Sequence, residues 1–233
     1  MILSALIIVD SLAKYYAVNL KTGKLIWSKT NSAPFNSQIK VYEDVFFVTD
    51  YENILRCFSI INGDEIWNVN TESTFIKSQK KLSLVVVEDK IIFNNSVGDI
   101  IAVNATTGDI IWQTPTQDSS IYENSFLLQT SDLVADKSSI LKSNNKNEFF
   151  SISVKTGTIN WQNKINSNVR PSVIDNLVFT VTIEGFLVVI DNSTGNIIRI
   201  TNIFDKLKKR KKSNTKPVGF IVGTNNIYLT TDN

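Results

Sequence analysis

The sequence contains no histidine and only one cysteine, Cys57. Without an imidazole the chain cannot form a Ser-His-Asp or Cys-His pair, in which histidine takes the proton from the nucleophile. The usual zinc sites need several His or Cys ligands, so they are excluded too. One thiol cannot form an internal disulfide, and cysteine usage therefore leaves both cytosol and periplasm open. We predict no catalytic or metal-binding residue, and we expect Cys57 to be a small core residue.

Long hydrophobic runs are also absent. The N-terminal segment 1–9 is apolar, but a bilayer span needs roughly 20 apolar residues. The segment has no basic lead-in, no small-residue cleavage site and no lipid-anchor cysteine, so we interpret it as a β-strand and not as a signal peptide. Over the whole chain, 42% of residues are hydrophobic and 20% are charged, which is typical of a soluble globular protein.

Positive charge is concentrated in one place. Seven of the 24 basic residues lie between positions 206 and 216, and the other 17 against 22 acidic residues leave the rest of the chain at minus 5. The densest part is a run of five residues: Lys208, Lys209, Arg210, Lys211 and Lys212. Like charges at this density repel each other, which predicts a solvated loop over 205–216.

A nine-residue phrase with a glycine at its fifth position occurs five times. Its glycines are Gly23, Gly63, Gly108, Gly157 and Gly195. Four residues after the glycine stand Trp27, Trp67, Trp112 and Trp161, which are all the tryptophans of the chain, and then Arg199. The spacings of 40, 45, 49 and 38 residues indicate an internal repeat of about 43 residues.

A second repeated feature lies at a nearly constant distance from the phrase glycine. Turn-forming pairs place Asp44, Asp89 and Asn176 each 19 residues before the next phrase glycine, whereas Asp136 lies 21 residues before Gly157. Short β-rich runs lie between the landmarks, with no helical periodicity. Each repeat therefore predicts four antiparallel strands, A to D, in a meander, which is a β-propeller blade.

The phrase glycine follows a turn residue and precedes a strand, so it is expected to close the C–D hairpin with a positive φ. The polar residue four positions earlier is expected to bind the backbone amides of the turn. The tryptophan is expected to pack against the next blade while its N–H finds a backbone acceptor. Because Arg199 replaces the fifth tryptophan, we expect blade five to be the loosest complete blade.

Taken together, the repeats predict an all-β protein: a single partial β-propeller domain over 1–233, with about five and a half four-stranded antiparallel blades in an incomplete ring. The expected blade ranges are 1–31, 32–74, 75–118, 119–167, 168–204 and 217–233, with the basic loop at 205–216.

The phrase, preceded by paired short strands, resembles the tryptophan-docking repeat of quinoprotein-like (PQQ-like repeat) propellers. Segments 170–179 and 185–191 are most similar to the BamB-type outer-membrane assembly proteins. This resemblance implies an eight-bladed ring that acts as a non-enzymatic periplasmic scaffold at the outer membrane, with partners in the outer-membrane assembly machinery. Blades missing from this chain are then expected from another chain or a second copy.

The enzymes of the same superfamily are quinone-dependent dehydrogenases. The resemblance implies that they carry calcium, a catalytic Asp, a stacking Trp and often adjacent cysteines. This chain has a single cysteine and therefore no adjacent pair, and every Trp belongs to the repeat. We therefore expect no cofactor and no enzyme activity. A fragment of such a dehydrogenase remains one alternative, and a propeller that binds other proteins in a different role is another.

For the basic run, the plainer interpretation is a solubilising connector. The alternatives are contact with an anionic lipid surface or with an acidic partner. Nucleic-acid binding is not expected, because the run has no interleaved aromatic residues that could stack on bases.

Overall fold

The computed structural model describes residues 5–72, 81–116, 129–208, 211 and 215–232. All elements with defined bounds are β-strands, and the chain divides into two compact units, Met1–Phe126 and Leu127–Asn233. Within the described ranges, no helix has the length and apolar character needed to cross a membrane.

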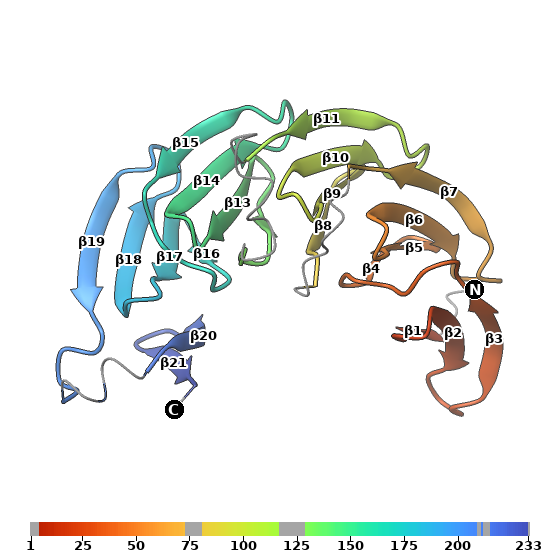
Figure 1. Cartoon of the computed structure of the whole chain (residues 1–233), viewed down its shortest axis with the longest axis horizontal. Coiled ribbons are helices and arrows are strands. Elements are labelled where there is room, and N and C mark those ends of the chain that lie inside the picture. The colour runs from red at the N-terminus through yellow and green to blue at the C-terminus, as the bar shows by residue number, and fades with distance from the viewer. Residues whose placement is uncertain (1–4, 73–80, 117–128, 209–210, 212–214, 233) are drawn as a thin grey trace. The chain divides into compact units, whose positions relative to one another are not determined.

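The first unit contains three sheets (Figure 1). Sheet 1 consists of β1 (Ala5–Val9), β2 (Lys14–Asn19) and β3 (Leu25–Thr30). Sheet 2 consists of β4 (Lys40–Tyr42), β5 (Val45–Thr49), β6 (Ile54–Ser59) and β7 (Glu65–Asn70). Sheet 3 consists of β8 (Leu84–Val87), β9 (Lys90–Asn94), β10 (Ile100–Asn104) and β11 (Ile110–Thr114).

The second unit also contains three sheets. Sheet 4 consists of β12 (Val134–Ala135), β13 (Ser139–Asn144), β14 (Glu148–Ser153) and β15 (Ile159–Asn163). Sheet 5 consists of β16 (Ser172–Ile174), β17 (Leu177–Val181), β18 (Phe186–Asp191) and β19 (Ile197–Asn202). Sheet 6 consists of β20 (Pro217–Val222) and β21 (Ile227–Thr231).

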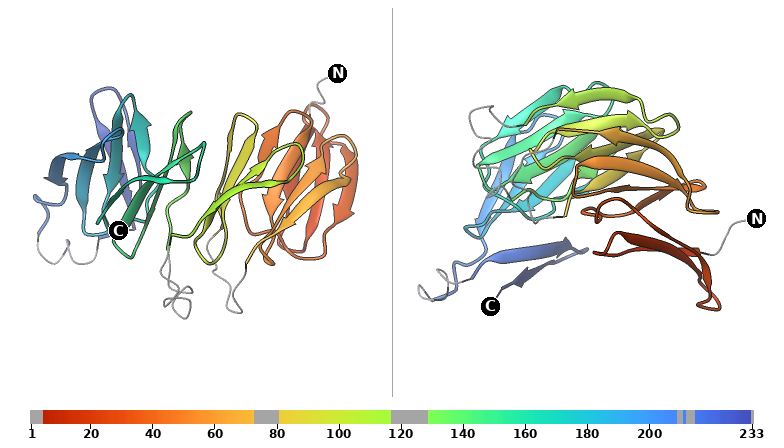
Figure 2. Two further views of the ribbon diagram at one scale, coloured as in Figure 1. Left: turned by 90° about the horizontal axis from the view of Figure 1, so that it is seen from above. Right: turned by 45° about the vertical axis from the view of Figure 1, so that its right-hand side comes forward.

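In every sheet, strands that follow each other in the sequence pair antiparallel, so each sheet is a meander, as the four-stranded repeat predicts (Figure 2). Four sheets have four strands, and in the described residues sheet 1 has three and sheet 6 has two. The first strand of sheet 1 corresponds to strand B of the repeat, and sheet 6 contains strands A and B.

The cores lie between successive sheets of a unit, because the middle strands have apolar residues on both faces. In β5, Phe46 packs with Tyr15 of sheet 1, whereas its neighbour Phe47 packs with Phe93 and Ile101 of sheet 3. All five side chains are at most 5% exposed. Alternation along an extended strand sends neighbouring residues to opposite faces, which explains why the middle strands read as continuous apolar runs.

The 19-residue spacing found in the sequence corresponds to one repeated hydrogen bond between the two turns at the same end of a sheet. Ile60 N donates to Asp44 O at 2.9 Å, and Ala105 N donates to Asp89 O at 2.8 Å. In sheet 4, Val154 N donates to Ser138 O at 2.9 Å. The prediction that this landmark lies at Asp136 is wrong. Ser138 lies 19 residues before the glycine and makes the bond, because the link between β12 and β13 is longer than a two-residue turn.

Candidate functional site

The repeated phrase forms the turn between the last two strands of sheets 1 to 5, which are strands C and D of the repeat. In sheet 3, the Asn104 side-chain oxygen accepts hydrogen bonds from Thr106 N at 2.9 Å and Thr107 N at 3.0 Å, and Gly108 N donates to Asn104 O at 2.9 Å. The five phrase glycines have φ between 66° and 79°, the left-handed region that closure of this turn requires. Side chains of the other phrases bind turn amides in the same manner: Asn19, Ser59, Ser153 and Asp191.

Three tryptophans lie against the phrase glycine of the next sheet. A Cβ atom at Gly63 would lie 2.7 Å from Trp27 Cζ3, and one at Gly195 would lie 2.5 Å from Trp161 Cγ. Trp27 Nε1 donates to Ile60 O at 2.9 Å, and Trp161 Nε1 donates to Asn192 O at 2.7 Å. At these two positions, close packing and an indole hydrogen bond occur together.

Trp67 is different. Its ring carbon Cδ2 would lie 2.8 Å from a Cβ at Gly108, so it packs as Trp27 does, but its Nε1 is buried without a hydrogen-bond partner among the described residues. The expectation that every indole N–H finds a backbone acceptor is therefore wrong for Trp67. Trp112, the fourth tryptophan, is 9% exposed, and the next phrase glycine, Gly157, has a φ of 73°. At the first phrase glycine, Gly23, a Cβ atom would meet nothing within 4 Å.

Opposite each tryptophan on the neighbouring strand stands a small residue. The pairs are Ala17 with Trp27, Cys57 with Trp67, Ala102 with Trp112 and Ser151 with Trp161, and each pair is followed by a register shift. Val189 pairs with Arg199 in sheet 5, where the arginine side chain is exposed. Burial raises the pKa of the Cys57 thiol to about 12, so this cysteine is protonated and unreactive at neutral pH. That blade five is the loosest stays a prediction.

The five-residue basic run is only partly described. Lys209, Arg210 and Lys212 lie outside the described residues, whereas Lys208 and Lys211 are exposed and Lys211 N donates to Lys208 O at 2.8 Å. Binding of this run to a lipid or an acidic surface stays a prediction.

A third repeated position, which was not predicted from the sequence, lies 13 residues before each phrase glycine. It lies in the turn between strands B and C of the repeat. Asp10 Oδ1 accepts from Leu12 N and Lys14 N, and Asp50 Oδ1 accepts from Glu52 N and Ile54 N, all between 2.8 and 3.1 Å. The equivalent residues are Asn95, Asn144 and Thr182, which also accept from turn amides. The signal was present in the sequence as an Asp, Asn or Thr at a constant offset from the glycine.

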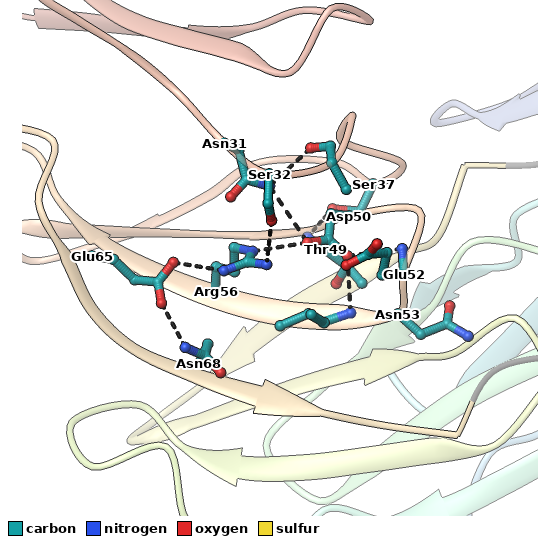
Figure 3. Close-up of polar contacts among 12 residues, drawn as sticks. Asn31, Ser32, Ser37, Thr49, Asp50, Glu52, Asn53, Arg56, Glu65 and Asn68 are labelled. Atoms are coloured by element: carbon teal, nitrogen blue, oxygen red, sulfur yellow. Dashed lines mark hydrogen bonds and ion pairs between the residues drawn. The ribbon is translucent and has the colours of Figure 1, made fainter.

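A charged cluster around Arg56 lies inside sheet 2 (Figure 3). Arg56 Nε is 2.8 Å from Asp50 Oδ2, and Arg56 Nη1 is 2.7 Å from Glu65 Oε2. Arg56 is 8% exposed and Asp50 is fully buried. Burial by itself would lower the pKa of Arg56, but its hydrogen bonds to the two carboxylates outweigh burial and raise it. The cluster is therefore a closed set of ion pairs whose geometry favours a structural role.

A polar cavity of about 570 Å³ lies at the turns of sheets 4 and 5. The residues that line it are all serine or asparagine: Ser138, Ser139, Ser153, Asn160, Asn176, Asn192 and Ser193. No sequence motif predicted it, because its members come from five separate segments of the second unit.

The described residues do not fit a pyrroloquinoline quinone with its calcium. The indoles of Trp27, Trp67 and Trp161 lie against glycines of the neighbouring sheet, so their faces are not free to stack on a planar quinone. Within the described ranges, no group of three or more His, Cys, Asp or Glu side chains is placed to hold a metal ion.

Comparison with known proteins shows the family to which this chain belongs. Residues 4–201 match the model of the family described as outer membrane protein assembly factor BamB. An uncharacterized protein of Rickettsia conorii is 24% identical over 183 residues, which are 72% of this chain and 41% of that protein. This chain thus spans less than half the length of that relative.

Solved structures show the same fold at low sequence identity. BamB from Moraxella catarrhalis has a TM-score of 0.70 at 14% identity, covering 86% of this chain and 62% of that one. The computationally designed Ika8 protein has a TM-score of 0.71 at 12% identity, covering 98% and 65%. A quinohemoprotein alcohol dehydrogenase from Pseudomonas putida HK5 has a TM-score of 0.64 at 14% identity, covering 87% and 41%. The fold is a β-propeller with PQQ-like repeats, and this chain covers part of each of these relatives.

Proposed function

Because the chain belongs to the outer membrane protein assembly factor BamB family, we propose that it is a non-catalytic scaffold that assists the assembly of β-barrel proteins into the outer membrane. The observation that carries this proposal is the family match over residues 4–201. The proposed location is the periplasmic side of the outer membrane, where the partner proteins would be accessible to it.

The chemistry of the chain supports a binding role over a catalytic one. A chain without histidine lacks the side chain that most often takes and returns protons near neutral pH. Its single thiol is buried, and the charged cluster around Arg56 consists of groups already paired with each other. The polar side chains of its repeated turns bind their own backbone, which builds a rigid scaffold for the loops.

The experiment that tests the role is loss of the protein in its native cell. Deleting the coding segment should lower the amount of folded β-barrel proteins in the outer membrane, measured by heat-modifiable gel mobility. Affinity capture from native envelopes should recover β-barrel assembly proteins. Unchanged β-barrel levels together with capture of unrelated proteins would replace this role by another protein-binding one. A bound chromophore after addition of pyrroloquinoline quinone and calcium would instead support the dehydrogenase alternative.

We further propose that sheet 6 is completed by strands from another chain or a second copy. Sheet 6 has two described strands where the complete sheets have four, and Val218, Ile221 and Tyr228 are 59–70% exposed on it. Exposed apolar side chains on a short sheet favour pairing with further strands. Light scattering of the purified chain should therefore give a mass above that of one copy, or a mass that rises when its partner is added. A strictly monomeric chain that binds no hydrophobic dye would contradict this.

A further inference from the structure

Most hydrogen-bond donors of the side chains that line the polar cavity of sheets 4 and 5 are already used. Asp136 lies behind one side of it. Its carboxylate accepts hydrogen bonds from Ser138 Oγ at 2.9 Å, Ser139 Oγ at 3.0 Å and Asn192 Nδ2 at 3.0 Å. A carboxylate that accepts several hydrogen bonds stays ionised, and it fixes which end of the Asn192 amide faces it.

On the other side of the cavity, the carboxylate of Asp191 also accepts hydrogen bonds from lining residues. It accepts from Ser193 Oγ at 2.6 Å and from Asn176 Nδ2 at 2.9 Å. The third amide, Asn160 Nδ2, donates to Ser151 Oγ at 3.2 Å. Because an ionised carboxylate can only accept, the amide orientations of Asn176 and Asn192 follow from chemistry and not from an arbitrary choice between oxygen and nitrogen.

What remains for a ligand is therefore mainly a set of acceptors. The side-chain oxygens of Asn160 and Asn176 accept no hydrogen bond among the described residues. Asn192 Oδ1 has no partner there either, but it is buried and would reach a ligand only after the side chain shifts. The serine oxygens keep unused lone pairs. All lining residues are uncharged, and two carboxylates, those of Asp136 and Asp191, accept hydrogen bonds from them, which favours a cation over an anion as the ligand.

We propose that this cavity binds the guanidinium group of an arginine side chain presented by a partner protein. A guanidinium is a cation that carries only donors, five N–H bonds in one plane, and so matches acceptors that converge from several strands. The lining contains no aromatic side chain on which a sugar ring could stack, and no cation that would attract a phosphate or carboxylate. The inference does not depend on the role in outer membrane assembly, since the cavity would take an arginine from any partner.

Peptide binding to the full chain tests the proposal. Isothermal titration with acetyl-Gly-Arg-Gly-amide should give saturable binding. The matched peptide with citrulline, which has the same shape but no charge, should bind about tenfold more weakly or worse. Free arginine as a third ligand separates a small-molecule site from a peptide site: comparable affinity for free arginine would replace the partner protein by the free amino acid. Equal binding of the arginine and citrulline peptides would overturn the proposal.

Two variants locate the site. Asn160→Leu and Asn176→Leu remove one acceptor each, and each should weaken binding of the arginine peptide about tenfold. Asn196→Leu is the matched control, because Asn196 is an exposed asparagine of the sheet 5 turn that does not line the cavity. Circular dichroism and the urea midpoint should be unchanged for Asn160→Leu, whose side chain is exposed. Unchanged arginine binding in that folded variant would remove the cavity as the site. Defective β-barrel assembly with intact peptide binding, or the reverse, would separate this inference from the proposed function.

Discussion

The first unit contains two interfaces between neighbouring sheets, and the side chains that meet at them differ in chemistry. The interface between sheets 1 and 2 holds the ring cluster of Tyr15, Phe35, Phe46 and Phe58, and it is crossed by polar contacts. Tyr15 OH donates to Gly63 O at 3.1 Å, Trp27 Nε1 donates to Ile60 O, and Lys29 pairs with Asp64. The Arg56 cluster borders this interface, because Arg56 lies on the same face of β6 as Phe58 and its Nη2 reaches Ser32 Oγ at 3.2 Å.

The interface between sheets 2 and 3 has an apolar core, and its polar contacts join the turns that follow β5 and β9. Asn53 Nδ2 donates to Ser96 Oγ at 2.5 Å, and Ser96 N donates to Asn53 Oδ1 at 3.2 Å. Leu55, Val69, Leu84 and Ile91 belong to its core, and the indole N–H of Trp67 has no partner there among the described residues. The same phrase therefore produces the same close approach of tryptophan to glycine in both interfaces. Close packing and polar anchoring are separate properties, and only the packing follows from the repeat.

The largest expected effect is that of Arg56→Met on the polar interface. The substitution keeps an unbranched apolar stem but leaves Asp50, which is fully buried, without its cation. Breaking a buried pair in this way costs about 3–5 kcal/mol of unfolding free energy. Urea unfolding measures the change. Arg199→Met, at an exposed arginine of β19, is the control and should stay within about 0.5 kcal/mol of the parent. Equal effects of the two substitutions would contradict the distinction between the two environments.

The packing shared by the two interfaces is tested by a pair of glycine substitutions. Gly63→Ala places a methyl group 2.7 Å from the Trp27 ring at a φ of +71°, and we expect a loss of about 3 kcal/mol. Gly23→Ala has a similar φ of +66° but open space around the new methyl group, so backbone strain alone should cost about 1 kcal/mol. Thermal or urea unfolding gives the difference. A Gly23→Ala variant as unstable as Gly63→Ala would show that contact with the indole contributes little.

The indole hydrogen bond can be isolated by comparing Trp27→Phe with Trp67→Phe. Both substitutions remove similar ring area, but only the first leaves a carbonyl, that of Ile60, without its donor. Trp27→Phe should therefore be about 1 kcal/mol more destabilising than Trp67→Phe. The readout is the urea midpoint at a fixed slope. Equal losses would mean that the two indoles have equivalent partners in solution.

The smallest effect concerns pH and a turn of sheet 5 in the second unit. Hydrogen bonds, first from the Ser193 hydroxyl and then from Thr194, lower the pKa of Asp191 to about 2, below the value of about 3.9 for an unfolded aspartate. A lowered pKa means that the ionised group stabilises the fold above about pH 4 and that this contribution disappears as the pH falls toward 2. Asp191→Asn makes the turn resemble that of Asn104 and should flatten the pH dependence of the urea midpoint between pH 5 and 2. An unchanged pH dependence would contradict this.

Much of the fold could be predicted from the sequence because local chemistry repeats. The turns depend on residues a few positions apart, such as Asn104 with Gly108, and their spacing predicts the strands and the meander. The error at Asp136 arose where the link between β12 and β13 departs from the two-residue turn. The third landmark, represented by Asp50, was present in the sequence at a constant offset but has a less distinctive composition than Gly and Trp.

The sequence by itself determined that this is an all-β chain of four-stranded units joined through glycine and tryptophan, because each unit encodes its own turns and alternating faces. Only the tertiary structure decided which interfaces are polar and where acceptors converge. The partner of an indole N–H, the closure of the Arg56 cluster and the acceptor-lined cavity each depend on side chains from different turns or strands. Their orientations are fixed by what they meet in space and not by their neighbours in the chain.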